Sequence, residues 1–268
     1  MTRLTTEWIQ NMEKELPQWT QKLERQSNMS LLNLASLGGD VSRGRVKSAS
    51  WRLKVAVVPV TAGLGIISTF CHQVAAIIHH MGFEVFVTKA TDVSGIYEAT
   101  QNGAGVIFMA DDKYFLAMNF NKNLVVENSD ATARGFVAAL EGAAGGLRDK
   151  EVLVMGGGRV GRAALSFLRC RGADGVVYDQ DAEVLKQLQA EGWRTTKCLE
   201  KVKEYPLVVD CTFSEGGWLK KEMLHPEVIF ASPAVPLSLD EEAAEALGDR
   251  VIHDLLQLGV ITMLAMAC

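Results

Sequence analysis

The feature that most constrains this chain is a succession of short, continuously apolar segments of strand length. Strands that are apolar without alternation are buried on both faces, which requires a parallel sheet covered by helices. The sequence therefore predicts an α/β protein with two such sheets, one in each half of the chain. The predicted strands are residues 55–60, 84–88, 106–110 and 123–127 in the first half, then 151–156, 175–179, 207–212 and 228–233 in the second.

The segment before the first predicted strand is expected to be mainly helical. Residues 4–24 carry apolar side chains at helical spacing, with Thr5 or Thr6 as a suitable N-cap. Residues 26–50 are rich in serine and glycine, which predicts a loop that carries one short helix.

Later segments also show helical patterns. Residues 130–147 predict a long alanine-rich helix that is capped by Asp130 and links the two halves. Residues 181–191 and 240–247 are helical candidates between strands of the second half. The apolar tail at 259–268 predicts a helix that packs back across the interface between the domains.

Composition excludes several classes of protein. A net charge of -5 leaves no basic face for nucleic acid or for anionic lipid. No run reaches the length of a membrane span, and the N-terminus lacks the apolar centre of a signal peptide. The five cysteines form no CxxC pair, which is typical of reduced thiols. We therefore expect a soluble, cytoplasmic protein, and the apolar tail with the N-terminal helix favours a homodimer.

A metal site is not expected from the histidines. His72, His79 and His80 share one helical segment without a carboxylate or cysteine at ligand spacing. His225 and His253 are isolated, and no order of serine, histidine and aspartate typical of a hydrolase can be assembled.

The strongest local motif is a glycine loop, VLVMGGGRVGRAALSFL, between an apolar strand and a helix. Gly156, Gly158 and Gly161 have the GxGxxG spacing that allows a tight turn, close approach of a pyrophosphate and close packing of helix on strand. The N-terminus of the following helix then presents free N–H groups to the phosphates. Val160 belongs to the same loop, and Arg159 and Arg162 are either pyrophosphate ligands or solvated side chains.

The residues beyond this loop specify which dinucleotide it binds. Asp179 ends the next strand 23 positions after Gly156, where a carboxylate holds both hydroxyls of an adenosine ribose. Its charge repels a 2′-phosphate, so NAD is favoured over NADP. Thr212, Ser232 and Pro233 end later strands, near where nicotinamide should lie. The structural alternatives are a nucleotide fold that has lost its ligand, or an Asp179 that caps the next helix.

These motifs predict two Rossmann-like domains with parallel sheets, an N-terminal helix and an interdomain cleft. Residues 1–148 are expected to form the N-terminal helix and a substrate-binding α/β domain. Residues 149–268 are expected to form the NAD-binding Rossmann domain, including the C-terminal helix. Ligands of parallel sheets bind beyond the carboxyl ends of the strands, so the first domain should bind its substrate there.

Two adjacent carboxylates, Asp111 and Asp112, stand at such a strand end. Asp112 is expected to cap a helix formed by KYFLAMN, because aspartate is among the best N-caps. Asp111 is expected to face the cleft, although it can also be a solvated surface carboxylate. A carboxylate there suits an ammonium group and can accept its proton, so that hydride can leave the adjacent carbon.

Four segments resemble the pyrrolysine synthase (PylD) family. They are VVPVTAGLGIISTF, DVSGIYEATQNGA, IFMADDKYFLAMN and VLVMGGGRVG. The resemblance runs in register from about Val55 to Asp179, and the MADD and PVT-loop segments are more particular to the family than any glycine pattern. Similarity is weaker at DCT, at ASPAVP and in the C-terminal helix, and among the first 50 residues it lies mainly in the helix beginning near Leu4.

The resemblance implies a substrate, which is lysine acylated on its ε-amine by 3-methyl-D-ornithine. It implies that NAD⁺ oxidises the terminal amine of the ornithine chain, and that ammonia loss and attack by the α-amine close the methylpyrroline ring. It also implies that Asp111 is the active-site acid. The implied substrate contacts are Leu4, Val60, Thr61, Ala62, Ala110 and Asn128. Residue 62 is serine in the family pattern, so only a backbone contact is available at Ala62.

Two other functions are compatible with the residues. The first is another two-domain dehydrogenase of the shikimate or amino-acid type, which pairs a lysine with an aspartate; Lys89 and Asp92 are present but lie outside a convincing motif. The second is a non-catalytic NAD-binding sensor, which binds the cofactor without turnover.

Overall fold

The structure is a computed structural model that describes residues 4–66 and 69–268. Its chain divides into two compact units. The first unit holds the described residues of 1–21, 30–135 and 255–268, and the second holds 22–29 and 136–254. The domain boundary expected at residue 148 stays a prediction. The compact units differ from it, because residues 136–148 group with the second sheet and the C-terminal segment groups with the first.

The N-terminal region is more helical than the sequence predicts. The expected helix at 4–24 is instead two helices, α1 (Thr6–Ile9) and α2 (Met12–Ser27). The Gln73 side chain accepts the N–H of Glu13 at 2.9 Å, which provides a partner at the start of the second helix. Residues 26–50 hold two helices rather than one, α3 (Leu31–Gly38) and α4 (Arg43–Ser50). Ser30 and Ser42 cap them by accepting backbone N–H groups, so serines that suggested a loop are helix starts.

The sheet of the first unit has the strand order β2-β1-β3-β4-β5. β1 pairs in parallel with both β2 and β3, whereas β4 is antiparallel to both of its neighbours. β5 therefore runs in the same direction as β3, and the carboxyl ends of β1, β2, β3 and β5 lie at one edge. The bounds are β1 (Lys54–Val58), β2 (Glu84–Val87), β3 (Val106–Ala110), β4 (Phe115–Asn119) and β5 (Leu124–Glu127).

The strand β4 corrects a sequence-based prediction, because the segment was expected to be a helix capped by Asp112. Its side chains alternate between buried and half-buried, with Phe115 and Ala117 buried. Phe115 lies against Phe70 and Phe108, with ring centroids 5.4 and 6.1 Å apart. Pairing and aromatic packing therefore outweigh the helix propensity of Leu, Ala and Met in this segment.

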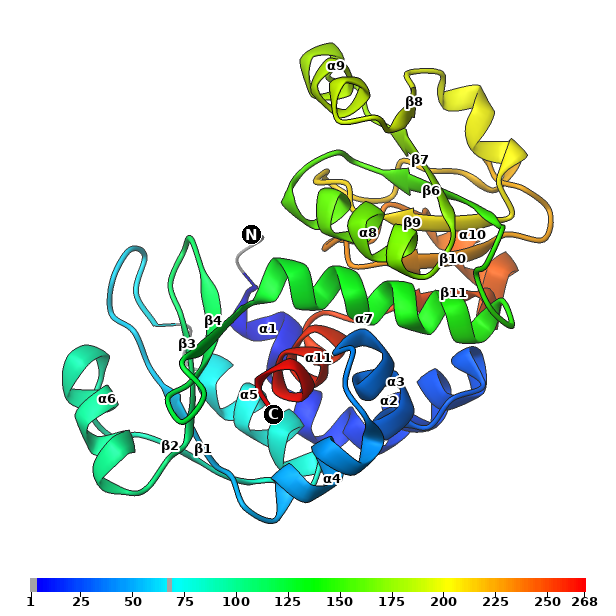
Figure 1. The fold of residues 1–268 in the computed structure, drawn as a ribbon. Coiled ribbons are helices and arrows are strands. Elements are labelled where there is room, and N and C mark those ends of the chain that lie inside the picture. The colour runs from blue at the N-terminus through cyan, green and yellow to red at the C-terminus, as the bar shows by residue number, and fades with distance from the viewer. Residues whose placement is uncertain (1–3, 67–68) are drawn as a thin grey trace. The chain divides into compact units, whose positions relative to one another are not determined.

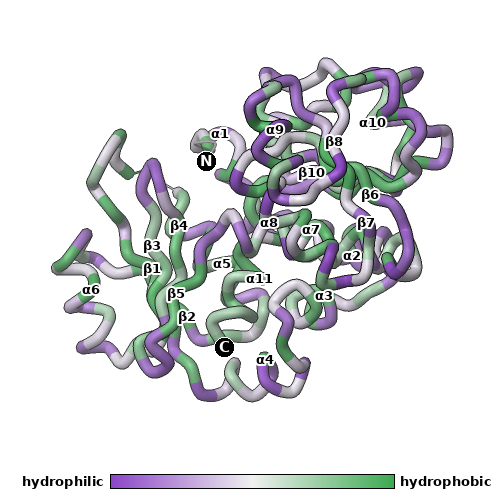
Figure 2. The backbone as a smooth tube through the Cα atoms, turned by 45° about the horizontal axis from the view of Figure 1, so that its top comes forward, coloured by the Kyte–Doolittle hydropathy of each residue, from purple (hydrophilic) through white to green (hydrophobic). Residues whose placement is uncertain are grey.

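Helices cover both faces of this sheet (Figure 1). α6 (Asp92–Gln101) packs on one face, where Ala56, Val58 and Ile107 meet Ala99 of the helix. α5 (Phe70–His80) and α11 (Gln257–Ala267) pack on the other, as Figure 1 shows. The strands β1 and β3 are coloured as hydrophobic in Figure 2, as the continuous apolar pattern predicts.

The C-terminal helix α11 is confirmed and belongs to the first unit. Its residues are apolar on all sides, and such a helix is stable only when it is surrounded. It contacts α3, α5, β4 and β5. The backbone carbonyl of Cys268 accepts Arg45 Nε at 3.1 Å and also contacts Lys122 Nζ.

The second unit contains a six-stranded sheet in the order β11-β10-β9-β6-β7-β8, and all of its strands are parallel. Numbered along this unit, the order is 6-5-4-1-2-3, which is that of a dinucleotide-binding Rossmann fold. The sequence predicted four of these strands and missed the short β8 and β11. The bounds are β6 (Glu151–Met155), β7 (Asp174–Tyr178), β8 (Arg194–Thr196), β9 (Leu207–Asp210), β10 (Ile229–Ser232) and β11 (Val251–His253).

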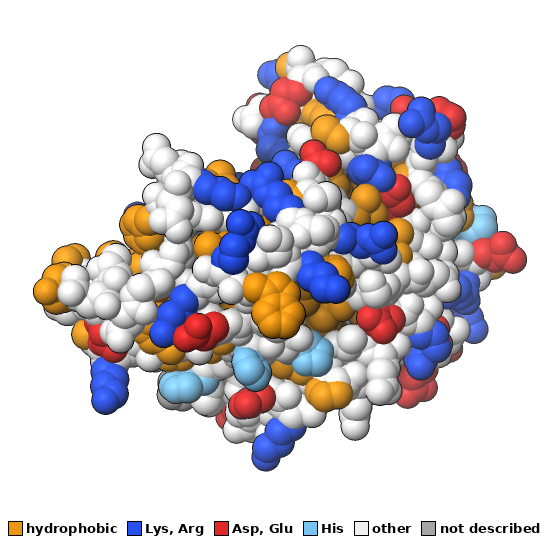
Figure 3. Space-filling view, turned by 60° about the horizontal axis from the view of Figure 1, so that its bottom comes forward, with side chains coloured by type: hydrophobic (Ala, Val, Ile, Leu, Met, Phe, Trp, Pro, Cys, Tyr) orange, Lys and Arg blue, Asp and Glu red, His pale blue; other side chains and the backbone are white. Residues whose placement is uncertain are grey.

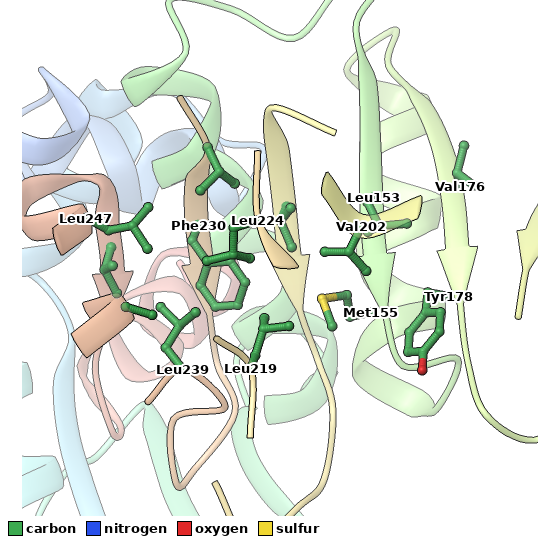
Figure 4. Close-up of a cluster of buried hydrophobic side chains, with 14 residues drawn as sticks. Leu153, Met155, Val176, Tyr178, Val202, Leu219, Leu224, Phe230, Leu239 and Leu247 are labelled. Carbon is green, nitrogen blue, oxygen red and sulfur yellow. The ribbon is translucent and has the colours of Figure 1, made fainter. Parts of the chain in front are cut away.

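Helices and an apolar core complete the second unit. α8 (Arg159–Cys170) packs on β6, β7 and β9, and α9 (Ala182–Ala190) packs on β8. The helix α10 (Glu241–Leu247) and the 3₁₀ helix η1 (Leu199–Glu204) contribute Ala243, Leu247 and Val202 to a buried cluster with Phe230. Leu219, Phe230 and Leu239 point toward one another in this cluster (Figure 4). The predicted helices at 181–191 and 240–247 are confirmed.

The helix α7 (Asn128–Ala143) starts in the first unit and continues in the second. It begins two residues earlier than predicted, so Asp130 is not its cap. Asp130 lies in the first turn and forms an ion pair with Arg134, at 2.9 Å between Oδ2 and Nε.

Candidate functional site

The glycine loop joins β6 to α8, as its spacing predicts. Gly156 has a φ of +92°, and a Cβ there would lie 2.8 Å from the carbonyl oxygen of Cys211. Gly158 is the N-cap of α8, and a Cβ built on it meets nothing within 4 Å. The N-terminus of α8 therefore faces open space across a residue without a side chain, which fits the approach of a pyrophosphate.

Two further glycines of the loop have no room for a side chain. A Cβ on Gly161 would lie 1.9 Å from the carbonyl oxygen of Gly156, so the helix packs directly on the turn. A Cβ on Gly157 would lie 2.6 Å from Val184 Cγ1 and 2.7 Å from Leu188 Cδ1, both in α9. The GxGxxG spacing predicts this packing role for Gly161 but gives none to Gly157, which belongs to the same run of three glycines.

Asp179 follows β7 and lies beside the glycine loop. Its Oδ2 accepts the N–H of Gly157 at 2.7 Å, and its Oδ1 accepts the N–H of Asp181 at 2.9 Å. Each oxygen keeps a second lone pair, so the half-buried carboxylate can still accept two ribose hydroxyls. Asp181, not Asp179, caps α9 by accepting the N–H of Glu183 at 2.8 Å. The capping alternative for Asp179 is therefore wrong.

The two arginines of the loop differ in their surroundings. Arg162 forms an ion pair with Glu191 and donates to Gln187 Oε1 at 3.3 Å, so it ties α8 to the end of α9. Arg159 is exposed in the first turn of α8, and Val160 beside it is half-buried. Of the two cations, Arg159 is the exposed one.

A buried carboxylate organises the ends of β9 and β10. Asp210 is fully buried, and its Oδ1 accepts the N–H and the hydroxyl of Thr212 at 3.1 and 2.6 Å. Its Oδ2 accepts the hydroxyls of Ser232 and Ser238 at 2.8 and 2.5 Å. Ser232 is itself fully buried, and Pro233 after it is half-buried. The strand ends in the sequence indicate Thr212, Ser232 and Pro233 but not Asp210, which joins Thr212 to Ser232.

The second candidate region is the edge of the first unit at which β1, β2, β3 and β5 end; we call it the carboxyl edge. Three of its parts are the loop at 59–66, the turn between β3 and β4, and the start of α7. Ala110 pairs with Phe115, and the next residue of β4, Leu116, pairs with Glu127. This register brings the turn with Asp111 and the start of α7 to the same edge, as the sequence predicts. Ile67 and Ser68 of the quoted loop lie outside the described residues.

Asp111 forms the turn that leads from β3 into β4. Its Oδ1 accepts the N–H groups of Lys113 and Tyr114, both at 2.7 Å, and its own N–H donates to the carbonyl of Tyr114 at 2.8 Å. These backbone hydrogen bonds, that of Tyr114 first, lower the pKa of Asp111 from its usual range. The side chain is exposed, so an ionised carboxylate is presented at the carboxyl edge.

Asp112 holds the loop at 59–66 instead of capping a helix. Its Oδ2 accepts the N–H of Leu64 at 2.6 Å. Gly63 has a φ of +72°, and a Cβ there would lie 2.0 Å from the same oxygen. Only glycine fits at residue 63 while Asp112 keeps this contact. The two neighbouring aspartates therefore have different structural roles. Asp111 accepts hydrogen bonds within its own turn, and Asp112 accepts one from the loop at 59–66.

A third aspartate holds the other part of the same loop. Asp92 accepts the N–H of Thr61 on Oδ1 at 2.9 Å and the Thr61 hydroxyl on Oδ2 at 2.7 Å. Its own N–H donates to the carbonyl of Pro59 at 2.9 Å, and its φ of +54° is uncommon for a residue other than glycine. The Thr61 hydroxyl, followed by its N–H, lowers the pKa of Asp92. Asp92 lies 31 residues from Thr61, and the sequence suggested it only as the partner of Lys89 in another type of dehydrogenase, not as a residue that holds this loop.

The remaining predicted contacts differ in exposure. Thr61 and Ala62 are exposed, Val60 and Ala110 are half-buried, and Leu4 is buried just before α1. Asn128 is half-buried at the start of α7, and its Oδ1 accepts the Thr132 hydroxyl at 3.2 Å. A Cβ on Gly259 of α11 would lie 2.9 Å from that Oδ1. Asn128 is thus confined by its own helix and by α11.

The described residues hold no group of three or more histidine, cysteine, aspartate or glutamate side chains arranged to bind a metal ion. His72, His79 and His80 are exposed on α5, and His80 Nε2 lies 2.8 Å from the Thr20 hydroxyl. Figure 3 shows histidines among charged side chains at the surface. Within the part of the chain that the structure describes, no helix is both long enough and apolar enough to cross a bilayer.

Comparison with known proteins identifies relatives over most of the chain. Residues 6–126 match the family model for the pyrrolysine biosynthesis protein PylD, N-terminal domain. The chain is 32% identical over 213 residues to a pyrrolysine synthase of Methanosarcina acetivorans, covering 79% of this chain and 81% of that protein. It is 33% identical to a pyrrolysine synthase of Methanosarcina barkeri over the same length, covering 80% of that relative.

Solved structures share the fold at lower identity. Quinate dehydrogenase from Corynebacterium glutamicum, in complex with NAD, has a TM-score of 0.54 and 15% identity, and the match covers 80% of this chain and 92% of that one. Shikimate 5-dehydrogenase from Thermus thermophilus, in complex with NADP(H) and shikimate, has a TM-score of 0.52 and 18% identity, with 80% and 90% covered. These likenesses confirm the two-sheet, Rossmann-like α/β fold.

Proposed function

The chain belongs to the pyrrolysine synthase (PylD) family, and on this premise we propose that it catalyses the NAD-dependent oxidation of the terminal amine of 3-methyl-D-ornithyl-N6-lysine. The observation that carries the proposal is the carboxyl edge of the first unit. There an exposed, ionised Asp111 stands at the end of β3, and Asp92 and Asp112 fix the neighbouring loop. The names of the relatives support the pathway, and the fold of the second unit supports a nicotinamide cofactor.

The proposed reaction converts one amine carbon and closes one ring. The terminal ammonium loses a proton, and its carbon then gives up a hydride, which leaves an iminium ion. The α-amine of the methylornithine attacks the iminium carbon, and ammonia and a proton leave, which produces the methylpyrroline ring of pyrrolysine. The bound NAD⁺ supplies the hydride acceptor. The residues of the chain bind and orient the substrate and manage the proton.

Asp111 is the residue that we assign to the ammonium group. Its pKa is lowered by backbone hydrogen bonds, so in the free protein it is a counterion for a cation more than a base. A bound substrate would exclude water from this exposed carboxylate, and desolvation raises the pKa of a carboxyl group. Proton transfer from the ammonium to Asp111 then becomes easier, which frees the nitrogen lone pair for hydride departure.

Five of the substrate contacts that we propose lie with Asp111 at the carboxyl edge. Val60, Thr61 and Ala62 offer the backbone of the loop that Asp92 and Asp112 hold, and Ala110 precedes Asp111 directly. The amide of Asn128 adds a polar contact at the start of α7, and Leu4 adds an apolar one. The interdomain cleft and the homodimer stay predictions, and light scattering of the purified protein measures the second.

The terminal amine is the group on which this proposal depends. NADH formation, followed by absorbance, should occur with methylornithyl-lysine and not with the same compound acetylated on its terminal amine. Acetylation removes both the positive charge that Asp111 binds and the lone pair that hydride loss requires. Equal rates with the two compounds would show that another carbon is oxidised.

We further propose that Asp179 selects NAD over NADP. Replacing Asp179 by asparagine keeps an acceptor for the N–H of Gly157 but removes the charge that repels a 2′-phosphate. We expect the ratio of kcat/KM with NAD⁺ to that with NADP⁺ to fall by about tenfold, the effect of one close charge interaction. Asp181→Asn, with the same charge change two residues further on, is the matched control. Equal changes in both variants would remove the ribose role from Asp179.

A second prediction concerns the hydrogen bonds that join Asp92 to Thr61 in the loop at 59–66. In Asp92→Asn the positive φ remains tolerable, but the amide cannot accept both donors of Thr61 as the carboxylate does. We expect KM for the amine substrate to rise about fivefold, the size of one hydrogen bond on an exposed loop. The affinity for NAD⁺ should stay the same. Glu84→Gln, a charge change on the same sheet at the start of β2, should leave both quantities unchanged.

A further inference from the structure

Asp210 is a buried negative charge that the proposed mechanism does not use. Its four hydrogen bonds come from one backbone N–H and three hydroxyl groups, those of Thr212, Ser232 and Ser238. Among the described residues, no lysine or arginine forms an ion pair with it. Burying a carboxylate without a cation costs stability, so its presence at 0% exposure needs a reason beyond packing.

The groups next to Asp210 do not neutralise its charge. His253 Nδ1 lies 2.8 Å from the carbonyl oxygen of Ser232, and burial lowers the pKa of this histidine, so it is uncharged near pH 7. Burial also raises the pKa of the Cys211 thiol well above its usual value, which keeps it uncharged. Within the described part of the chain, the negative charge of Asp210 is therefore balanced by dipoles of hydroxyl and backbone groups.

The position of Asp210 in the sheet indicates what the charge acts on. It is the last residue of β9, the fourth strand of a Rossmann sheet and the first of its second mononucleotide-binding half. The residue after it donates its N–H to Met155 O at 2.7 Å, which joins this strand end to the glycine loop. In this fold the second half holds the nicotinamide mononucleotide, and at this strand end the half-buried Thr212 donates its hydroxyl to Asp210.

The hydroxyl groups add a second constraint. Thr212, Ser232 and Ser238 each direct their proton to Asp210, so the oxygen of the half-buried Thr212 can only accept a hydrogen bond on its other side. An acceptor at this position suits the amide N–H of a carboxamide. The same carboxylate thus supplies a negative field and fixes the hydrogen-bonding role of Thr212.

We infer that Asp210 is a positioning residue for the nicotinamide end of the cofactor, and that its buried charge makes the protein bind the cationic oxidised form in preference to the neutral reduced form. This inference rests on the proposed use of NAD. A preference of this kind assists turnover, because the cofactor loses its positive charge when it accepts hydride. The reduced product is then held less tightly than the oxidised cofactor that replaces it.

The test compares the dissociation constants of NAD⁺ and NADH for the full chain and two variants, measured by titration calorimetry. In Asp210→Asn, Kd for NAD⁺ should rise about tenfold relative to Kd for NADH, the effect of a unit charge removed at a distance of roughly 10 Å. Ser238→Ala removes one hydrogen bond to Asp210 and keeps its charge, so the ratio of the two constants should stay at the wild-type value.

Three results would overturn the inference. In the first, Asp210→Asn weakens both forms equally, which leaves a structural role only and does not affect the proposed function. In the second, Ser238→Ala changes the ratio as much as Asp210→Asn does. In the third, the wild-type protein binds neither form, which overturns the proposed function as well. If Asp210→Asn does not fold, judged by circular dichroism, Asp210→Ser removes the same charge and is measured in its place.

Discussion

Replacing Asp111 by asparagine is expected to abolish turnover of the amine substrate, with a loss of about a thousandfold in kcat/KM, the usual scale for removing a general base. Asparagine keeps an oxygen that can accept the N–H groups of Lys113 and Tyr114, so the turn into β4 should remain. The variant therefore removes the charge and the basic site without altering the fold. Rates of NADH formation give the loss, and titration calorimetry should show unchanged affinity for NAD⁺.

The adjacent residue provides the control. Asp112→Asn makes the same change of charge one position away, and its amide oxygen can still accept the N–H of Leu64. We expect its effect on kcat/KM to be small beside that of Asp111→Asn. Near-full activity of Asp111→Asn would remove Asp111 from the mechanism, and equal losses in the two variants would show that their roles are not separate. NAD⁺ binding by a wild-type protein that never turns over would favour a sensor.

The lowered pKa of Asp111 also bears on the pH dependence of the free enzyme. A carboxyl group with a depressed pKa is charged throughout neutral and mildly acidic solution and loses its charge only as the pH falls below the usual range of about 4. Between about pH 5 and pH 8, Asp111 therefore keeps its charge and adds no step to the pH profile of kcat/KM. The residual activity of Asp111→Asn should show a pH profile of the same shape as that of the wild type.

Replacing Gly158 by valine is expected to lower the affinity for NAD⁺ by about a hundredfold or more, because a branched side chain would fill the space through which a pyrophosphate approaches the loop. The structure shows why the protein should remain folded. A Cβ on Gly158 meets no atom within 4 Å, and its φ of -72° is ordinary for any residue. Calorimetric titration with NAD⁺ measures the loss, and thermal unfolding should show little change in Tm.

Gly161→Ala is the opposite case within the same loop. Its Cβ would lie 1.9 Å from the Gly156 carbonyl oxygen, so helix and turn must separate, at a cost of roughly 1–3 kcal/mol of folding free energy. This variant should lower Tm, whereas Gly158→Val should not. Unchanged NAD⁺ affinity in folded Gly158→Val would contradict the placement of the cofactor on this loop.

The second unit could be predicted from the sequence because its signals are local. The strand, the glycine loop and the helix follow one another without interruption, and Asp179 stands at the expected distance. The structure brings Asp179 to the Gly157 N–H. The short strands β8 and β11 were missed because three residues carry too little pattern to distinguish a strand from a loop.

The first unit was harder to predict, since several of its features depend on distant residues. β4 contains good helix formers and becomes a strand only because β3 and β5 lie beside it. The bond from Asp92 to Thr61 spans 31 positions and that from Asp112 to Leu64 spans 48, so neither can be read from spacing. The helices α3 and α4 are not evident from the sequence, because serines such as their caps, Ser30 and Ser42, are also typical of loops.

In the candidate site, too, some residues could be predicted from the sequence and others depend on distant parts of the chain. The resemblance to the family pointed to Asp111, Thr61 and Asn128, and the structure brings their segments to one edge of the sheet. The residues that hold them, Asp92 and Gly259, carry no motif. Their roles depend on hydrogen-bond geometry and on the space around a backbone atom, and only the folded chain determines these.

The central claim is that this chain oxidises and cyclises methylornithyl-lysine, and product analysis tests it most directly. Purified protein is incubated with NAD⁺ and the synthetic substrate, and NADH is followed by absorbance while the product is identified by mass spectrometry. We expect NADH and a cyclic imine in equal amounts, with the product lighter than the substrate by ammonia and by the two hydrogens removed in the oxidation. Confirmed NAD⁺ binding with no NADH and no change in substrate mass would contradict the account.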